Sequence, residues 1–451
     1  LLTDRELQTA TKGQVIWVDE AGLLSTRDMK RLFDLAAREG CRVVLSGDSA
    51  QHAAVGRGDA LRLLEQQAGV HFARLSTIRR QTVEEYRAAV REISDGDARL
   101  PDGRTRLEAG IARLDRMGAI IELQGEARHR QLAADYATAT EQKARLGRTK
   151  TALVVSPTHR EGEQVAVAIR AELKRRGRLS GGERYFLSLR SLGLTEAQRS
   201  VVTSYGGGEV IRFNQNVSGF RRGERVTVAG VSGDVVNVRH SDGRIAVLPL
   251  KEAARFEVYE ARSLALAAGD RLRITQNGFT RERKRAGESV KSRLNNGDIF
   301  EVAGFTMQGD IRLANGFVVP RDYGGIAQGY VVTSHASQGS TVDRVLIALG
   351  AQSLAAANRQ QFYVSVSRGR EAVRLYTDDR QGLMEAVKAD ASRLSATELL
   401  LGSTTRPKRA GSSAKVVSLV RARRAFEERR ERLEVVALLR HPHAEAAHAR
   451  H

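Results

Sequence analysis

The sequence predicts an α/β protein with two parallel-sheet lobes and a small β-barrel inserted into the second lobe. Three observations lead to this fold class. Short apolar runs alternate with helical patterns at the start of the chain, this alternation restarts at Thr151, and from about Tyr205 the period changes to short alternating strands. At 451 residues the chain is also too long for one hydrophobic core. We expect a first lobe at 1–147, a second lobe at 148–204 and 321–402, the insertion at 205–320, and a basic tail at 403–451.

The first lobe should begin with alternating strands and helices. Apolar runs predict the strands, and apolar residues at helical spacing predict the helices. The expected strands are Val15–Val18 and Val43–Leu45, and the expected helices are Met29–Arg38, Ala60–Gln67, Thr105–Met117 and Ala127–Leu146.

The second lobe should open with a strand at Ala152–Val155 and a helix at Glu161–Arg175, and strand–helix alternation returns at Gly329. In between, alternating runs separated by Ser-Gly-Asp and Ser-Asp-Gly turns predict a meander of short strands. The expected strands include Arg225–Val228, Val235–Val238, Ile245–Leu248 and Arg271–Ile274, with hairpins continuing to Val319.

The charge of the chain favours a polyanionic partner. The net charge is +20, and neutralising phosphates releases counterions, which drives binding to nucleic acid. No apolar run is long enough to cross a bilayer. The single cysteine, Cys41, excludes an intramolecular disulfide and is expected to be a buried thiol at a strand edge. These features suit a cytoplasmic protein, and the absence of an initiator Met suggests a piece of a longer polypeptide.

Two carboxylates, Asp19 and Glu20, follow the first apolar strand directly. Ligands of open α/β sheets bind at the carboxyl ends of the strands. Asp19 could therefore hold Mg²⁺ through water, and Glu20 could orient and deprotonate an attacking water. The alternative is an acidic turn without chemical function.

The second strand ends in Gly47-Asp48, with Gln51 just beyond. An amide can hydrogen-bond both a phosphate and a water, although a loop Gln is normally only solvated. Arg80 lies in a stretch expected to follow a strand and precede a helix, where an Arg can reach a phosphate. Its alternative interpretation is an ordinary basic helix start.

The order of these motifs resembles that of superfamily 1 helicases, in particular the RecD-like branch that includes the helicase domains of TraI- and TrwC-type conjugative relaxases. Asp19-Glu20-Ala21-Gly22 resembles the Walker B motif of that family, and Gly47–Gln51 resembles its sensor motif. Arg80-Gln81 resembles the Arg-Gln pair that touches the γ-phosphate. The resemblance implies two RecA-like lobes that use ATP and Mg²⁺.

Two later stretches make the resemblance more specific. Thr333-Ser-His-Ala-Ser-Gln338-Gly339 is similar to the Thr-x-His-x-x-Gln-Gly element that couples DNA contact to the ATP cleft. The resemblance implies nucleotide contacts for Asp19, Asp48, Gln81, Gln338 and Gly339, and DNA contacts for Thr158, Thr333, Ser334 and His335. Residues 360–370 are similar to the motif that carries the arginine finger, here Arg368. Glu20, Gln51, Arg80 and Arg368 are then the expected catalytic residues.

The sequence departs from this family in one essential respect. It contains no G-x-x-x-x-G-K-[ST] phosphate-binding loop, which in the family precedes the Walker B motif. The first lobe is therefore expected to be incomplete, and the chain alone is expected to bind ATP poorly and not to unwind DNA. The tail histidines His441, His443, His448 and His451 do not make the metal cluster of a relaxase.

The leading hypothesis is an ATP-driven helicase motor on single-stranded DNA, moving 5′ to 3′, from a conjugative relaxase-helicase. Its partners would be single-stranded DNA, other conjugation or DNA-processing proteins, and the missing N-terminal part of its own polypeptide. Two alternatives remain. One is a non-catalytic single-strand-binding module of helicase descent, and the other is a RecD-like repair helicase unrelated to conjugation.

Overall fold

The computed structural model describes the chain except residues 69, 145–146, 282, 286–287, 390–435 and 438–451. The expected tail, 403–451, therefore lies outside the described residues apart from Val436–Ala437. The chain divides into two compact units, the first comprising Leu1–Ile169 with Val331–His451 and the second comprising Arg170–Tyr330.

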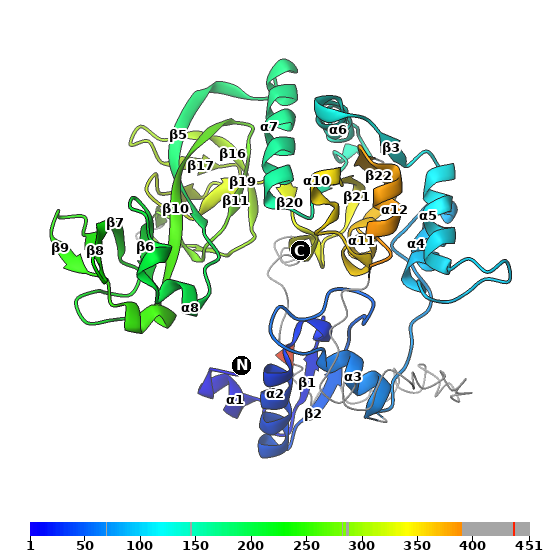
Figure 1. Ribbon diagram of the computed structural model, residues 1–451, viewed down its shortest axis with the longest axis horizontal. Helices are drawn as coiled ribbons and strands as arrows, with labels where there is room; N and C mark the ends of the chain where they lie inside the picture. The colour runs from blue at the N-terminus through cyan, green and yellow to red at the C-terminus, as the bar shows by residue number, and fades with distance from the viewer. Residues whose placement is uncertain (69, 145–146, 282, 286–287, 390–435, 438–451) are drawn as a thin grey trace. The chain divides into compact units, whose positions relative to one another are not determined.

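The first unit contains two parallel sheets. The smaller has the order β2-β1-β23, with β1 at Val15–Val18, β2 at Arg42–Leu45 and β23 at Val436–Ala437. Helix α2 (Thr26–Glu39) lies along this sheet (Figure 1) and buries Met29, Leu32 and Leu35 in one core with Ile16 and Val18 of β1.

Local signals set the ends of α2. The Ser25 side chain accepts a hydrogen bond from the Asp28 backbone N–H, which caps the first turn. Gly40 ends the helix in the left-handed conformation at φ +66°. Both predicted strands and the predicted helix are therefore present here, and Cys41 lies partly buried just before β2, where its thiol contacts the Thr11 carbonyl.

The larger sheet has five parallel strands in the order β20-β4-β21-β22-β3. Its strands are β3 Ile120–Glu122, β4 Ala152–Val155, β20 Val331–Val332, β21 Val342–Ala348 and β22 Gly369–Thr377. The α-helices of this part are α4 Glu84–Ser94, α5 Arg106–Arg116, α6 Gly125–Ala139, α7 His159–Arg175, α9 Ser334–Ser337, α10 Ala351–Leu354, α11 Arg359–Val366 and α12 Arg380–Ala386.

The boundary between the two lobes differs from the expected position at 147. Strand β3 pairs with β22 of the larger sheet, and helices α4 and α5 share the core of that sheet. Gly110 of α5 lets the two helices approach, because a Cβ there would lie 2.7 Å from Ile93 Cγ1 of α4. Most of the stretch after about Glu84 therefore belongs to the second lobe.

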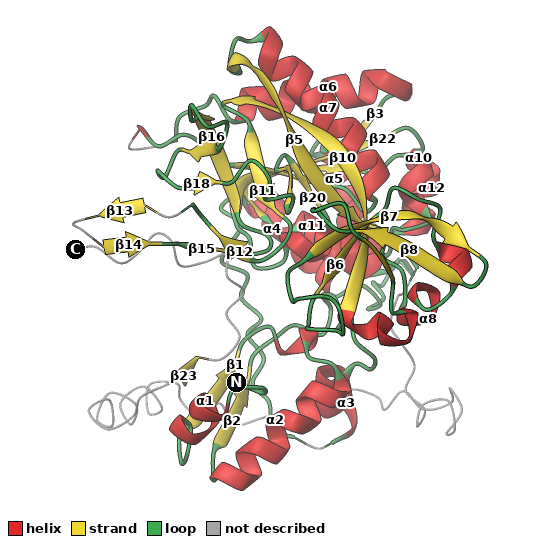
Figure 2. Ribbon diagram, turned by 90° about the vertical axis from the view of Figure 1, so that its left-hand side faces the viewer, coloured by secondary structure: helices red, strands yellow, loops and turns green. Residues whose placement is uncertain are grey.

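The second unit is antiparallel. One sheet has six strands in the order β5-β10-β6-β7-β8-β9, and another has five in the order β18-β17-β16-β11-β19. The long strands β5 (Ser180–Ser191) and β10 (Phe256–Ala268) run side by side (Figure 2). The insertion thus starts before the expected residue 205, and its described strands form these two larger antiparallel sheets and two two-stranded sheets.

The remaining helices belong to both units, and the remaining strands belong to the second unit. Its other strands are β6 Val210–Phe213, β7 Arg225–Ser232, β8 Val235–Arg239, β9 Ile245–Val247, β11 Arg271–Ile274, β12 Gly278–Phe279, β13 Arg283–Arg285, β14 Glu288–Val290, β15 Arg293–Leu294, β16 Ile299–Phe305, β17 Ile311–Leu313, β18 Val318–Val319 and β19 Ile326–Gln328. The remaining helices are α1 Arg5–Ala10, η1 Ala21–Leu23, α3 Ala60–Gln67, α8 Glu196–Arg199, η3 Val202–Ser204 and η4 Leu250–Arg255.

Candidate functional site

Asp19 and Glu20 lie at the carboxyl end of β1. The exposed Asp19 carboxylate accepts a hydrogen bond from the Ser46 hydroxyl at 2.7 Å. Among the described residues, Glu20 is the one non-glycine residue with a positive φ, at 52°. A bulky residue in this region is strained by about 1–3 kcal/mol and is found most often at functional sites.

The second polar cluster follows β2. Asp48 accepts hydrogen bonds from the Gln51 side-chain amide at 3.1 Å and from the Tyr363 hydroxyl at 2.9 Å. Gly47 is required here, because a Cβ would lie 2.8 Å from Leu61 Cδ2 and 3.2 Å from the Ala21 backbone nitrogen. The loop after β2 is therefore packed against the turn that follows β1.

Arg80 and its neighbours contact the second lobe through main-chain carbonyls. Residues 70–80 form no strand, so the expectation that Arg80 follows one was wrong, and α4 begins only at Glu84. We call the following set of contacts the backbone clasp. It consists of Arg80 Nη1 to Ser367 O at 2.9 Å, Gln81 Nε2 to Ser367 O at 3.0 Å and Gly369 O at 2.7 Å, and Thr82 N to Arg370 O at 2.8 Å.

Arg368 lies beside Arg80 and is only 1% exposed. Its Nε donates to the Val364 carbonyl at 2.9 Å and its Nη2 to the Ser367 hydroxyl at 2.9 Å. Burial, and then the charge of Arg80, lower the pKa of Arg368 to about 10. Burial also lowers the pKa of Arg80. Within the described part of the chain, neither guanidinium has a carboxylate within ion-pair distance, although the charge of Glu20 acts on both and that of Asp48 acts on Arg368.

A pocket of about 290 Å³ opens beside these two arginines. It is lined by Gln51, Ile78, Arg79, Arg80, Gln81, Val90, Tyr363, Ser367 and Arg368. The side-chain oxygens of Gln51 and Gln81 are buried without a hydrogen-bond partner. Unpaired acceptors and unpaired cations therefore meet in one place, which is the chemistry of a site for an oxyanion and a water.

The Thr333–Gly339 element reaches the first lobe. The Thr333 hydroxyl caps the short helix α9, and Gln338, 2% exposed, donates from Nε2 to Glu20 Oε2 at 2.8 Å. Gly339 adopts φ +78°, a conformation suited to glycine. The element thus contacts Glu20 directly.

A histidine pair forms a second connection between the lobes. His52, next to Gln51, is 4% exposed, lies 2.5 Å from the Ser334 hydroxyl through Nε2, and stacks on His335 with ring centroids 3.6 Å apart. Burial, followed by the charges of His335 and Arg368, lowers the pKa of His52 to about 3. Burial also lowers the pKa of His335, which remains exposed on one side. His52 is therefore neutral at physiological pH.

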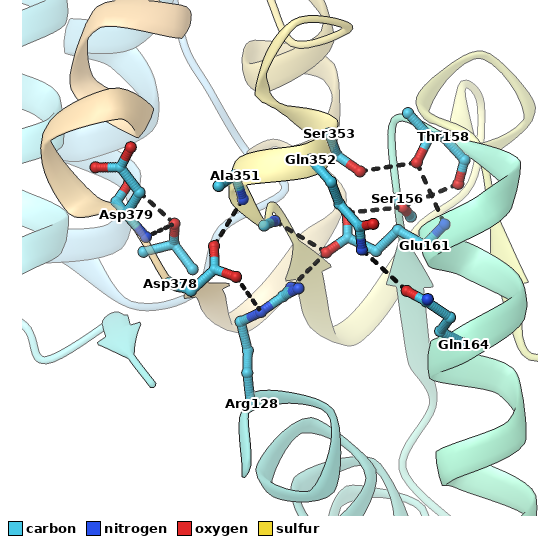
Figure 3. Close-up of polar contacts among 12 residues, drawn as sticks. Arg128, Ser156, Thr158, Glu161, Gln164, Ala351, Gln352, Ser353, Asp378 and Asp379 are labelled. Carbon is cyan, nitrogen blue, oxygen red and sulfur yellow. Dashed lines mark hydrogen bonds and ion pairs between the residues drawn. The ribbon is translucent and has the colours of Figure 1, made fainter. Parts of the chain in front are cut away.

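Thr158 lies elsewhere on the carboxyl edge of the larger sheet (Figure 3). Its hydroxyl is 2.7 Å from the Ser353 hydroxyl and accepts from the Glu161 backbone N–H at 3.3 Å. Glu161, fully buried, is ion-paired with Arg128 and accepts from the Gly350 N–H at 2.9 Å. Thr158 therefore belongs to a separate buried network that supports this edge of the sheet.

The structure brings most predicted site residues together. Those that meet around the pocket and the adjoining contact between lobes are Asp19, Glu20, Asp48, Gln51, Arg80, Gln81, Thr333, Ser334, His335, Gln338, Gly339 and Arg368. Sequence reasoning missed His52 and Tyr363. Their only sequence signal was their position, one next to Gln51 and the other five residues before Arg368.

Comparison with known families divides the chain as the motifs do. Residues 1–124 match an AAA domain, and residues 328–376 match a UvrD-like helicase C-terminal domain. The conjugal transfer protein TraA of Rhizobium radiobacter is 25% identical over 367 residues, covering 80% of this chain and 24% of TraA. The multifunctional conjugation protein TraI of Escherichia coli K12 is 23% identical over 403 residues, covering 82% of this chain and 22% of TraI.

The two matched segments and the order of the motifs make this chain similar to the RecD-like superfamily 1 helicases. It is distantly homologous to TraA and TraI, and it spans about a quarter of the length of these curated relatives. Among solved structures, Bacteroides Pif1 bound to single-stranded DNA aligns over 85% of this chain and 74% of Pif1, with 15% identity and a TM-score of 0.35. Candida albicans Pif1 aligns over 86% of this chain and 77% of its own, with 13% identity and a TM-score of 0.35. No helix within the described residues is long and apolar enough to cross a membrane.

Proposed function

We propose that this chain forms part of an ATP-driven motor that moves along single-stranded DNA. The observation that carries this proposal is the pocket lined by half-buried Arg80, buried Arg368 and Gln51. Among the described residues neither guanidinium has a carboxylate within ion-pair distance, and the Gln51 amide oxygen has no hydrogen-bond partner. Such a site favours an oxyanion that gains negative charge during reaction, as a transferred phosphoryl group does.

Each residue around the pocket has a role in this proposal. Arg368 and Arg80 stabilise charge on the transferred phosphoryl group, and Gln51 orients the attacking water through its free oxygen. Glu20 accepts the proton of that water. Asp19 offers a hard, exposed carboxylate beside the Ser46 hydroxyl, a donor set that fits Mg²⁺ held by one carboxylate and substrate phosphates. When bound, Mg²⁺ neutralises phosphate charge.

Coupling to DNA follows from the contacts of the Thr333–Gly339 element. Gln338 holds the carboxylate of the proposed base, Glu20, and Ser334 contacts His52 beside the proposed sensor. His335 presents its free side to solvent and, with Thr333 and Ser334, is the proposed DNA contact. Movement of this element on DNA binding would change the position of Glu20, which links strand binding to ATP hydrolysis. Thr158 is proposed as a further DNA contact at the same sheet edge.

We place the motor in conjugation because the TraA and TraI relatives are conjugation proteins by name. Translocation from 5′ to 3′ is the polarity implied by the RecD-like branch. The sequence contains no G-x-x-x-x-G-K-[ST] loop, so we expect this chain alone to turn over ATP slowly while still binding single-stranded DNA. The same expectation also fits the second candidate function, a non-catalytic module that binds single-stranded DNA.

The test compares Glu20→Gln and Arg368→Gln with a matched control, Glu126→Gln, which changes an exposed glutamate in the first turn of α6. The variants are made in the longer protein that carries this segment, and single-strand-stimulated ATP hydrolysis and oligonucleotide binding are measured. We expect hydrolysis to fall at least roughly 100-fold in both site variants, with binding of DNA retained. Wild-type hydrolysis in Glu20→Gln would remove Glu20 from the reaction, and absence of DNA binding by the unsubstituted chain would remove the proposed motor function.

A further inference from the structure

Two arginines stand directly opposite each other on the six-stranded sheet of the second unit. Arg212 of β6 is in register with Arg225 of the neighbouring strand β7. Cross-strand partners point to the same face, and like charges placed this way are destabilising. The opposite face carries the core residues Ile211 and Val226. Such a pair therefore requires either neutralisation or a function.

No carboxylate in the described part of the chain lies within ion-pair distance of either arginine, although the charge of Asp322 acts on Arg225. Glu257 of β10, the other neighbour of β6, is in register with Arg212, but its ion pair is with Arg199 at 3.3 Å. The Asp322 side chain, 79% exposed, has its ion-pair contact with Arg281 at 3.9 Å. Arg225 donates instead to the backbone carbonyls of Asp322, at 2.8 Å, and of Tyr323.

Gln276 adds an independent observation. It is 8% exposed, and its Oε1 accepts from Arg212 Nη1 at 2.8 Å, which fixes the orientation of the amide. Its Nε2 is buried and has no hydrogen-bond partner. An unpaired buried donor costs about 1–3 kcal/mol, so this position lacks an acceptor.

The polar groups around Gln276 are also hydrogen-bond donors or cations. Burial, and then the charge of Arg212, lower the pKa of Arg225. The Tyr259 hydroxyl, in hydrogen-bond contact with Arg212, has its pKa raised by burial, so it stays protonated. The Tyr323 hydroxyl already donates a hydrogen bond to the backbone carbonyl oxygen of Gln276 at 2.6 Å. The groups left without an acceptor are thus donors or cations.

The geometry points to a phosphate-binding site formed by Arg212, Arg225 and the Gln276 amide, whose ligand is a phosphodiester of single-stranded nucleic acid. A phosphate accepts from guanidiniums and an amide together, and its charge removes the repulsion between the two arginines. The choice of nucleic acid as the source of the phosphate rests on the proposed function, whereas the site itself rests only on these residues. It would give the insertion a grip on the strand apart from the ATP pocket.

The experiment measures binding of a fluorescent single-stranded oligonucleotide by this chain as a function of salt. Arg212→Gln should weaken binding roughly tenfold and make the salt dependence shallower by about 0.7 in slope, the value for one lost phosphate contact. Arg239→Gln is the matched control, because it removes the same charge from an exposed position on β8 of the same sheet. Equal losses in the two variants would overturn the site.

Gln276→Glu provides a second variant that keeps both arginines. Its carboxylate would neutralise the two arginines in place of the phosphate. We therefore expect weaker oligonucleotide binding than in Arg239→Gln and a higher melting temperature than that of the unsubstituted chain. Binding equal to that of Arg239→Gln would contradict the inference even if Arg212→Gln failed to fold.

Inorganic phosphate separates the site from its proposed ligand. We expect phosphate to raise the melting temperature of the unsubstituted chain but not of Gln276→Glu, and to compete with the oligonucleotide. If phosphate stabilises the chain in this way and no oligonucleotide binds, the site stands and the proposed function fails. If the oligonucleotide binds with no dependence on Arg212 or phosphate, the inference fails and the proposed function stands.

Discussion

Replacing Glu161 by Gln tests how the second lobe supports its sheet edge. Glu161 is fully buried and Arg128 is 2% exposed, and the two form an ion pair within the network of Figure 3. Gln keeps an oxygen for the Gly350 N–H but removes the charge that compensates Arg128. Removing one partner of a buried pair costs about 3–5 kcal/mol, because an unpaired charge remains inside.

The expected loss lies near the lower end of that range. Asp378 Oδ2 remains 3.8 Å from Arg128 Nε and partly compensates the guanidinium. A loss of about 3 kcal/mol corresponds to a roughly 150-fold faster opening, at 1.36 kcal/mol for each factor of ten. Native-state hydrogen exchange of the amides in α6 and α7 measures this locally, which a global unfolding curve of a two-unit chain does not.

The double variant Arg128→Met with Glu161→Gln decides the cause. Removing the uncompensated charge as well should restore most of the protection, since replacing both members of a buried pair is often nearly neutral. If the double variant exchanges as fast as Glu161→Gln alone, the loss does not come from a buried unpaired charge, and the reasoning is wrong.

Two further predictions concern the first unit. The pKa of His52 is about 3 in the folded chain against 6.5 for a free histidine, so the unfolded chain takes up a proton first as pH falls. Stability should therefore be lost from pH 6.5 downward by up to about 1.4 kcal/mol per pH unit. His52→Gln should remove that part of the slope in urea unfolding at pH 7.0 and 5.5, and identical slopes would exclude a buried neutral histidine. Gly110→Ala should destabilise by about 1–3 kcal/mol through overpacking, since its Cβ would lie 2.9 Å from the Ala89 carbonyl oxygen. An unchanged exchange rate in α4 and α5 would contradict this close packing.

The sequence was sufficient wherever a local pattern determines the structure. An apolar run followed directly by Asp19 and Glu20 marked the end of β1, and an apolar run followed by a Ser-Gly-Asp turn marked the end of β2. The buried positions of α2 follow its helical spacing. The helix α4 carries the same signal in Tyr86, Val90 and Ile93. The sequence predicted a helix after Arg80, but its bounds were not given.

Pairings between distant segments could not be predicted in this way. Strand β3 joins β22 about 250 residues later, which moved the lobe boundary, and β5 pairs with β10, which moved the start of the insertion. The three residues of β3, Ile120–Glu122, carry no local pattern that predicts which strand they pair with. The stacking of His52 on His335 is equally invisible in sequence, because it depends on where two loops from different sheets meet.

The backbone clasp has an uneven consequence for sequence variation. Arg80, Gln81 and Thr82 contribute donors, while the opposing segment contributes only carbonyl oxygens, which every amino acid possesses. Ser367 and Arg370 can therefore change identity without losing these bonds, whereas Gln81 has no ready substitute for an amide that reaches two carbonyls. A library that randomises both sides should recover many residues at 370 and few at 81. The side chains on one side therefore determine the contact, whereas the other side contributes only the course of its backbone.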